Sequence, residues 1–127
     1  MDKIIFVAGG GLNKTYINYV AGLTNKPNPR ICFVPTATGD SPNTILTWYT
    51  NCEDLPIRPY VMRSFINSNT TLQSFEETIM SMDAIIVGGG NTLNMMAIWK
   101  VQGIDVALRK AYEKGIILAG GSAGSLC

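Results

Sequence analysis

The chain has 127 residues and contains no histidine. This length allows one domain, and a composition of 46% hydrophobic and 15% charged residues is typical of a globular chain with an apolar core. Ten basic against nine acidic side chains leave a net charge of +1, which excludes the basic surface that nucleic-acid binding requires. Because histidine is absent, these residues cannot supply a histidine general base, metal ligand or pH switch.

The cysteines are sparse and stand at Cys32, Cys52 and Cys127. Their spacing fits neither a disulfide framework nor a metal site. The apolar run at residues 4–8 is too short for the core of a signal peptide. No stretch approaches the ~18 apolar residues of a membrane span. We therefore expect a cytoplasmic protein without a metal site or a membrane partner.

Hydrophobic periodicity predicts strands and helices in alternation. Short continuous apolar runs, typical of strands buried on both faces of a parallel sheet, occur at 4–8, 31–34, 84–87 and 116–119. A weaker strand at 60–65 is expected nearer a sheet edge. Apolar residues at helical spacing predict helices at 15–23, 42–52, 72–79, 92–102 and 104–114. The helix at 92–102 is apolar nearly all round, so we expect it to be well covered.

This alternation predicts an α/β fold with a doubly wound, mainly parallel sheet in three α/β/α layers, as in flavodoxin-like proteins, with residues 1–127 in one domain. Glycine-rich segments follow the strands at 4–8, 84–87 and 116–119. Open α/β sheets bind their ligands at the carboxyl ends of the strands. These segments are therefore the first candidates for a functional site.

The sharpest motif is Gly120-Gly121-Ser122-Ala123-Gly124, directly after a predicted buried strand. It fits the G-x-S-x-G nucleophile elbow, in which a strained strand-to-helix turn lifts the serine hydroxyl above the sheet edge. The glycines let the chain turn without Cβ clashes, and the amide of Ala123 can face a developing oxyanion. The alternative is a Gly/Ser turn that caps a helix or holds a phosphate.

A second glycine segment, Gly88-Gly89-Gly90, follows a predicted strand and precedes Asn91 and Thr92. Its backbone amides open a helix and can supply a second oxyanion donor. A tight turn with an Asn or Thr cap explains the same residues, and the two interpretations are compatible.

Two further loops belong to the same predicted edge. Gly9-Gly10-Gly11 lacks the spacing of a dinucleotide fingerprint. A turn beside the site fits it better, with Gly10 as a substrate-contact candidate. The loop 36–41 (TATGDS) offers Thr38 to a substrate, although Asp40 and Ser41 are also ordinary helix caps.

With both main motifs in hand, the chain resembles peptidase family S51, the dipeptidase E and cyanophycinase group, whose fold is related to class I glutamine amidotransferases. The resemblance runs end to end. It is carried by IIFVAGGG, ICFVPTATGDS, AIIVGGGNTLNMMAIWK and ILAGGSAGSLC, and the pairing of GGGNT with the SAGS elbow is its most specific part.

The resemblance implies a role for each matching residue. Ser122 matches the nucleophile, the amides of Ala123 and of Gly89 or Gly90 match the oxyanion hole, and Asn91 matches the asparagine of the family loop. The implied activity is hydrolysis of small peptides after an N-terminal aspartate, or of related β-aspartyl material, without a metal or organic cofactor.

One departure from the family pattern is large. Family members continue beyond the elbow helix, and their catalytic histidine and acid lie in that later part. We therefore expect the N-terminal part of a longer family domain, inactive alone, whose partner is a complementing C-terminal segment or a homo-oligomer. Two alternatives stay open: a non-catalytic α/β module that binds a small ligand or a partner, and an amidotransferase-like domain, against which a serine at 122 in place of cysteine argues.

Overall fold

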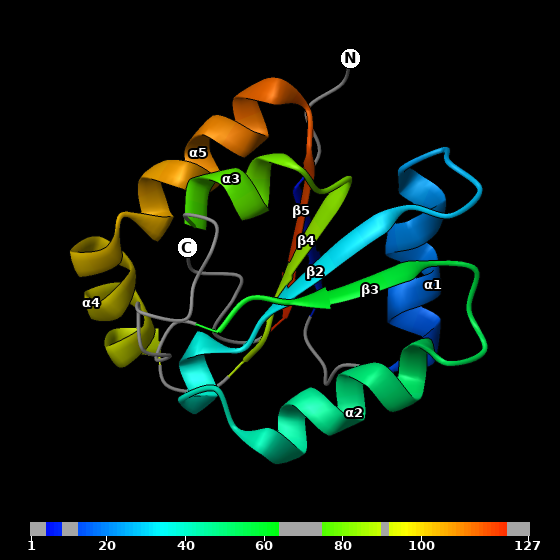
Figure 1. The fold of residues 1–127 in the computed structure, drawn as a ribbon, viewed down its shortest axis with the longest axis horizontal. Coiled ribbons are helices and arrows are strands. Elements are labelled where there is room, and N and C mark those ends of the chain that lie inside the picture. Colours follow the sequence, from blue (N-terminus) through cyan, green and yellow to red (C-terminus); the bar gives the residue numbers. More distant parts are fainter. Residues whose placement is uncertain (1–4, 9–12, 64–74, 90–91, 122–127) are drawn as a thin grey trace.

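The computed structural model describes residues 5–8, 13–63, 75–89 and 92–121 (Figure 1). Its strands are β1 (Ile5–Ala8), β2 (Arg30–Val34), β3 (Arg58–Val61), β4 (Ala84–Val87) and β5 (Ile117–Gly121). Its helices are α1 (Lys14–Leu23), α2 (Pro42–Cys52), α3 (Phe75–Met80), α4 (Thr92–Gln102) and α5 (Ile104–Lys114), with a 3₁₀ turn, η1 (Thr36–Thr38).

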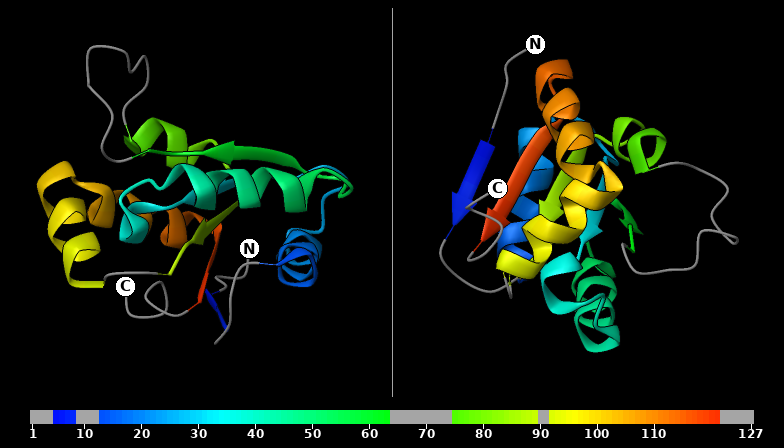
Figure 2. Two further views of the ribbon diagram at one scale, coloured as in Figure 1. Left: turned by 90° about the horizontal axis from the view of Figure 1, so that it is seen from below. Right: turned by 90° about the vertical axis from the view of Figure 1, so that its left-hand side faces the viewer.

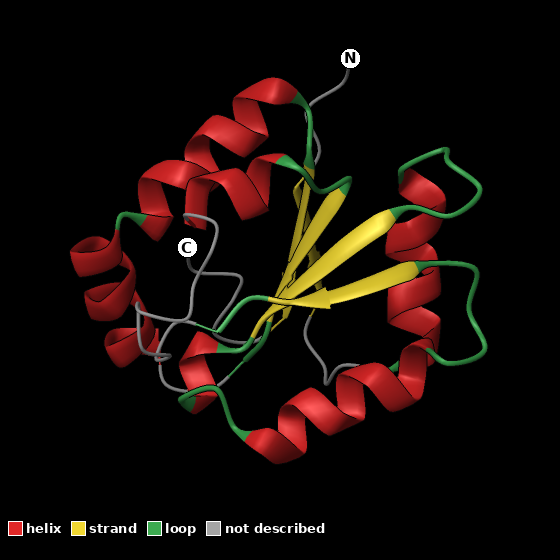
Figure 3. Cartoon of the chain, viewed as in Figure 1, coloured by secondary structure: helices red, strands yellow, loops and turns green. Residues whose placement is uncertain are grey.

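The described strands form one parallel sheet in the order β1-β5-β4-β2-β3. Figure 3 shows this sheet between two groups of helices. α1 and α2 cover one face, while α3, α4 and α5 cover the other. The predicted doubly wound, three-layer α/β/α fold is confirmed. The weak strand β3 lies at an edge, as expected, and Figure 2 shows β1 beside β5 at the opposite edge.

Alternate residues of the strands divide the core into two clusters. The cluster under α3, α4 and α5 takes the odd-numbered face of β4 and includes Ile79, Ile85, Val87, Met95, Trp99 and Ile104. The cluster under α1 and α2 takes the other face and includes Ile17, Ile31, Phe33, Trp48 and Ile86. Both faces of the central strands are therefore buried, which explains why these strands appear in the sequence as continuous apolar runs.

Local signals set the helix ends. The Asn13 side chain caps α1 by accepting a hydrogen bond from the Tyr16 amide at 2.9 Å. Pro42 occupies the first turn of α2, although the side chain of Ser41, its N-cap residue, makes no capping hydrogen bond. α5 ends at Gly115, whose left-handed φ of 99° suits a residue without a Cβ.

Two sequence-based expectations differ from the structure. The strand predicted at 60–65 is β3 at 58–61, where it pairs with β2 alone. The expectation that the helix at 92–102 is well covered was wrong, because Leu93 and Val101 are 81% and 87% exposed on the outer face of α4. Within the described residues, no helix has both the length and the apolar character needed to cross a membrane.

Candidate active site

Strand register brings the ends of four strands to one edge of the sheet. Ala8 pairs with Gly121, while Val87 pairs with Gly120 on one side and with Val34 on the other. The segments that follow β1, β5, β4 and β2 therefore all begin at the same carboxyl edge. The elbow sequence begins at the end of β5, a strand that lies between β1 and β4.

This edge also contains a topological switch point. The chain leaves β2 through α2 on one face of the sheet, and it leaves the neighbouring β4 through α4 and α5 on the other face. Ligand sites of open α/β sheets lie at such points. The loops at the ends of β2 and β4, which contain Thr38 and Gly89, are thus correctly placed for a binding site.

Gly88 fixes the path of the glycine turn after β4. Its amide donates to the Val34 carbonyl at 3.1 Å, so the ladder between β4 and β2 continues one residue beyond the strand. A Cβ at this position would lie 2.9 Å from Cζ of Phe33. Gly88 is buried, whereas Gly89 is partly exposed and is the first residue of the turn that a ligand can approach.

The η1 turn shapes the other wall of the edge. Thr38 is exposed, and its hydroxyl donates to the Pro35 carbonyl at 3.0 Å. Gly39 and Asp40 follow with left-handed φ angles of 67° and 57°. The Asp40 amide donates back to the same Pro35 carbonyl, which closes a compact loop.

A buried polar contact joins η1 to α4. Nε1 of Trp99 on α4 donates to Oγ1 of Thr36 on η1 at 3.0 Å. The sequence predicts a well-covered helix around Trp99 and a loop around Thr36, but it does not indicate that the two residues pair. No local pattern reports a contact across 63 residues. The available signal was a threonine close behind a buried strand, separated from it by Pro35 alone.

The remaining predicted site residues lie outside the described part of the chain. These are Ser122, Ala123, Gly90, Asn91 and Gly10. Their assigned roles stay predictions. Among the described residues, no group of three or more His, Cys, Asp or Glu side chains could hold a metal ion.

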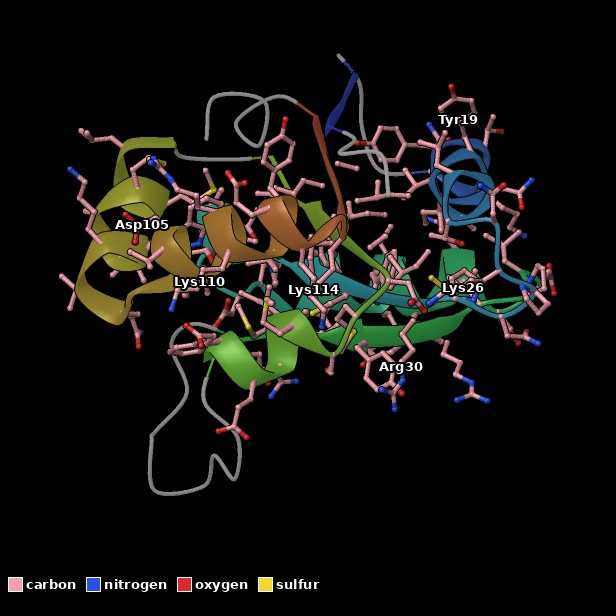
Figure 4. The ribbon with its side chains drawn as sticks, turned by 90° about the horizontal axis from the view of Figure 1, so that it is seen from above. Tyr19, Lys26, Arg30, Asp105, Lys110 and Lys114 are labelled. Atoms are coloured by element: carbon pink, nitrogen blue, oxygen red, sulfur yellow. The ribbon has the colours of Figure 1, made fainter. Side chains whose placement is uncertain are left out.

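One group of charged side chains lies at the opposite edge, where the strands begin. Asp83 accepts hydrogen bonds from Nζ of Lys26 and from the Arg30 amide. Burial by itself raises the pKa of Asp83, but these hydrogen bonds and the charges of Lys26 and Arg30 together outweigh it, and the pKa is lowered. Figure 4 shows Lys26 and Arg30 on the same side of the molecule. A cavity of about 430 Å³ lies here, lined by Lys26, Asp83 and Lys114 among others.

The thiols of Cys32 and Cys52 are free and buried in different clusters. Burial raises the pKa of each to about 12. A thiol of that pKa is protonated at neutral pH and unreactive as a nucleophile. Neither cysteine competes with Ser122 as a catalytic candidate.

The described chain is an α/β/α protein with a parallel sheet, and the ends of β4 and β5 lie side by side at its carboxyl edge. Residues 4–127 match the model of peptidase family S51, and the chain belongs to this family.

Over 132 aligned residues, the chain is 40% identical to the protein called uncharacterized peptidase YgaJ from Bacillus subtilis (strain 168). All of this chain and 56% of that protein are covered, so the chain spans about half the length of the relative.

Two solved structures share the fold. A peptidase from an acI-B1 Actinobacterium superposes with a TM-score of 0.75 at 20% identity, covering 94% of this chain and 54% of the other. A putative peptidase E protein from Listeria monocytogenes EGD-e superposes with a TM-score of 0.69 at 20% identity, covering 96% and 59%.

Proposed function

We propose that the protein is a serine peptidase of the dipeptidase E type that hydrolyses small peptides with an N-terminal aspartate. The observation that carries this proposal is the register of the sheet. It sets the end of β5, where the elbow sequence begins, directly beside the glycine turn that follows β4. Membership of family S51 and the 40% identity to YgaJ, which is named a peptidase, support the same class.

In the proposed reaction the Ser122 hydroxyl oxygen attacks the peptide carbonyl carbon and loses its proton to a general base. The amides of Ala123 and of Gly89 or Gly90 stabilise the oxyanion that forms. The C–N bond then breaks, the amine leaves with the proton, and an acyl-serine remains. Water hydrolyses this ester and restores the serine.

The general base is proposed to come from outside these 127 residues. A second copy of the chain cannot supply histidine, because the sequence contains none. A complementing segment is therefore the favoured source of the histidine and acid, and the 127 residues alone are proposed to be inactive. A cytoplasmic location is part of the proposal, because the buried thiols of Cys32 and Cys52 are free.

The test uses the natural gene product that carries these residues. Ser122→Ala should abolish hydrolysis of Asp-X dipeptides, and a fluorophosphonate should label the wild-type protein at Ser122. Ser125→Ala is the matched control, since it removes a hydroxyl from the same segment and should leave turnover intact. Equal turnover by wild type and Ser122→Ala would refute the serine mechanism. A folded wild type that binds peptide without cleaving it or reacting with the probe would favour the non-catalytic binding module.

A further inference from the structure

The hydrogen bond between Trp99 and Thr36 is unusual in its burial. Thr36 is 2% exposed and Trp99 is 1% exposed. Within the described part of the chain, Thr36 is the only polar or charged residue in the buried class. A buried hydroxyl or indole N–H is costly unless it is paired. An apolar residue at position 36 would take this acceptor away from the buried indole N–H, so the two residues depend on each other.

The bond joins the two segments that flank the switch point. Thr36 is the first residue of η1, with Pro35 between it and the end of β2. Trp99 lies on α4, the helix that follows the glycine turn of β4. α4 packs against η1, and Trp99 belongs to the same buried cluster as Val34 and Val87 at the ends of β2 and β4. A displacement of α4 would therefore move the turn that precedes it.

The opposite face of the sheet holds the same turn in place. Phe33 packs against Gly88 from the other core cluster, and its ring stacks on Trp48 with centroids 5.4 Å apart. On the face of the sheet covered by α1 and α2, the stacked rings of Phe33 and Trp48 thus support the start of the glycine turn at Gly88. On the other face, the indole hydrogen bond joins α4, the helix that follows the turn, to η1.

We infer that Thr36 and Trp99 are positioning residues that hold α4 against the η1 turn and thereby fix the amide of Gly89 for transition-state stabilisation. The inference rests on the proposed peptidase function, because it assigns the residues a role in the oxyanion hole of that reaction. Neither side chain is assigned a contact with substrate.

The inference predicts a selective kinetic effect in the natural gene product. Thr36→Val keeps the shape of the side chain but removes the acceptor, and Trp99→Phe removes the donor. A small displacement of a catalytic group can cost up to about a hundredfold in rate, so a displaced rather than deleted donor should lower kcat about tenfold. KM should change less than about twofold, because oxyanion contacts form in the transition state and not in the ground state. Thr36→Ser keeps the hydroxyl and should keep the wild-type kcat.

A substitution in the core that removes no hydrogen bond distinguishes a positioning role of Thr36 and Trp99 from a general effect on stability. Ile79→Val removes one buried methylene group from the same cluster as Trp99. It should lower the thermal midpoint while leaving kcat unchanged. Rates of phosphonate labelling at Ser122 provide a second readout that should fall with kcat in Thr36→Val and Trp99→Phe.

Each outcome decides the inference. Loss of kcat in Thr36→Val and Trp99→Phe, with wild-type kcat in Thr36→Ser, supports it. Wild-type kcat in both variants, or an equal loss in Ile79→Val, overturns it while the peptidase proposal stands. A wild-type protein that neither cleaves Asp-X dipeptides nor reacts with the phosphonate overturns both proposals together.

Discussion

Replacing Gly88 by alanine tests how tightly the glycine turn is built. An alanine Cβ would lie 2.9 Å from Cζ and 3.0 Å from Cε1 of Phe33. Favourable carbon–carbon contacts lie near 3.5–4.0 Å. Either the Phe33 ring or the end of β4 must therefore move by about half an ångström or more. Gly88 has no left-handed φ, so the clash alone opposes the substitution.

The Phe33 ring has little room to move. It is 1% exposed and stacks on the fully buried Trp48 at an interplanar angle of 20°. Overpacking of a well-packed core costs about 1–3 kcal/mol. Replacing glycine by alanine also restricts the unfolded chain and regains about 0.4–1 kcal/mol. We expect Gly88→Ala to lower the free energy of unfolding by roughly 1–2 kcal/mol.

The matched control is Gly22→Ala in α1, where an added Cβ meets no atom within 4 Å. This variant should gain about 0.5–1 kcal/mol, since alanine replaces glycine inside a helix. Equilibrium urea unfolding of the natural gene product, followed by circular dichroism, measures both. Phe33→Leu removes the two clashing ring atoms, so Gly88→Ala should cost less in that background. If Gly88→Ala is as stable as Gly22→Ala, the packing argument is wrong.

Three further predictions concern other parts of the fold. Gly115→Ala should destabilise the protein by about 1–2 kcal/mol in the same urea assay, because its φ of 99° disfavours a Cβ. The pKa of Asp83 is lowered from its ordinary value of 3.8 in the folded protein. This carboxylate therefore stabilises the folded state at pH values above 3.8, and the stabilisation is lost as the pH falls through the folded-state pKa. Urea titrations at a series of falling pH values should therefore show that the free energy of unfolding decreases less in Asp83→Asn than in wild type. In a Cys127→Ser variant, Cys32 and Cys52, each with a pKa of about 12, should react with Ellman's reagent at mildly alkaline pH only after unfolding. Rapid labelling of the native protein would contradict the burial of these thiols.

The central strands were predictable because burial on two faces leaves a strong mark in the sequence. Ile31 to Val34 and Ala84 to Val87 are continuous apolar runs, and both are buried throughout. β3 contains Pro59 and exposed Arg58, so the pattern that located the other strands is weak there. The edge position tolerates this weakness, since β3 needs a partner on one side only.

The error for α4 has a different physical origin. Its apolar residues occupy every face, and hydrophobic periodicity alone indicates a fully covered helix. Coverage depends on neighbours that are distant in the sequence. In the described structure Met95 and Trp99 face the sheet, while Leu93 and Val101 face outward and are exposed.

The sequence allowed us to predict at which edge of the sheet the candidate loops lie, but not the contacts that shape them. Glycine segments after strands indicate where turns lie, and the register confirms that the β4 turn and the start of the elbow sequence share one edge. The clash that requires glycine at 88 involves Phe33, a residue that sequence analysis treated only as part of a buried strand. Such requirements arise from pairs of residues brought together by the fold, and periodicity does not contain them.

The two ends of the sheet are stabilised in different ways, and this difference bears on function. At the amino edge, Asp83 is held by Lys26 and Arg30, so charge pairing and hydrogen bonds fix the strand starts. At the carboxyl edge, the turn after β4 consists of glycines, which have no side chains to hold it. On one face of the sheet, Phe33 packs against Gly88 and is itself stacked on Trp48. On the other face, α4, the helix that follows the turn, is bonded to η1 through Trp99 and Thr36. In the proposed serine mechanism, substitutions at these buried residues, none of which belongs to a catalytic motif, should therefore change the reactivity of Ser122 as well as stability.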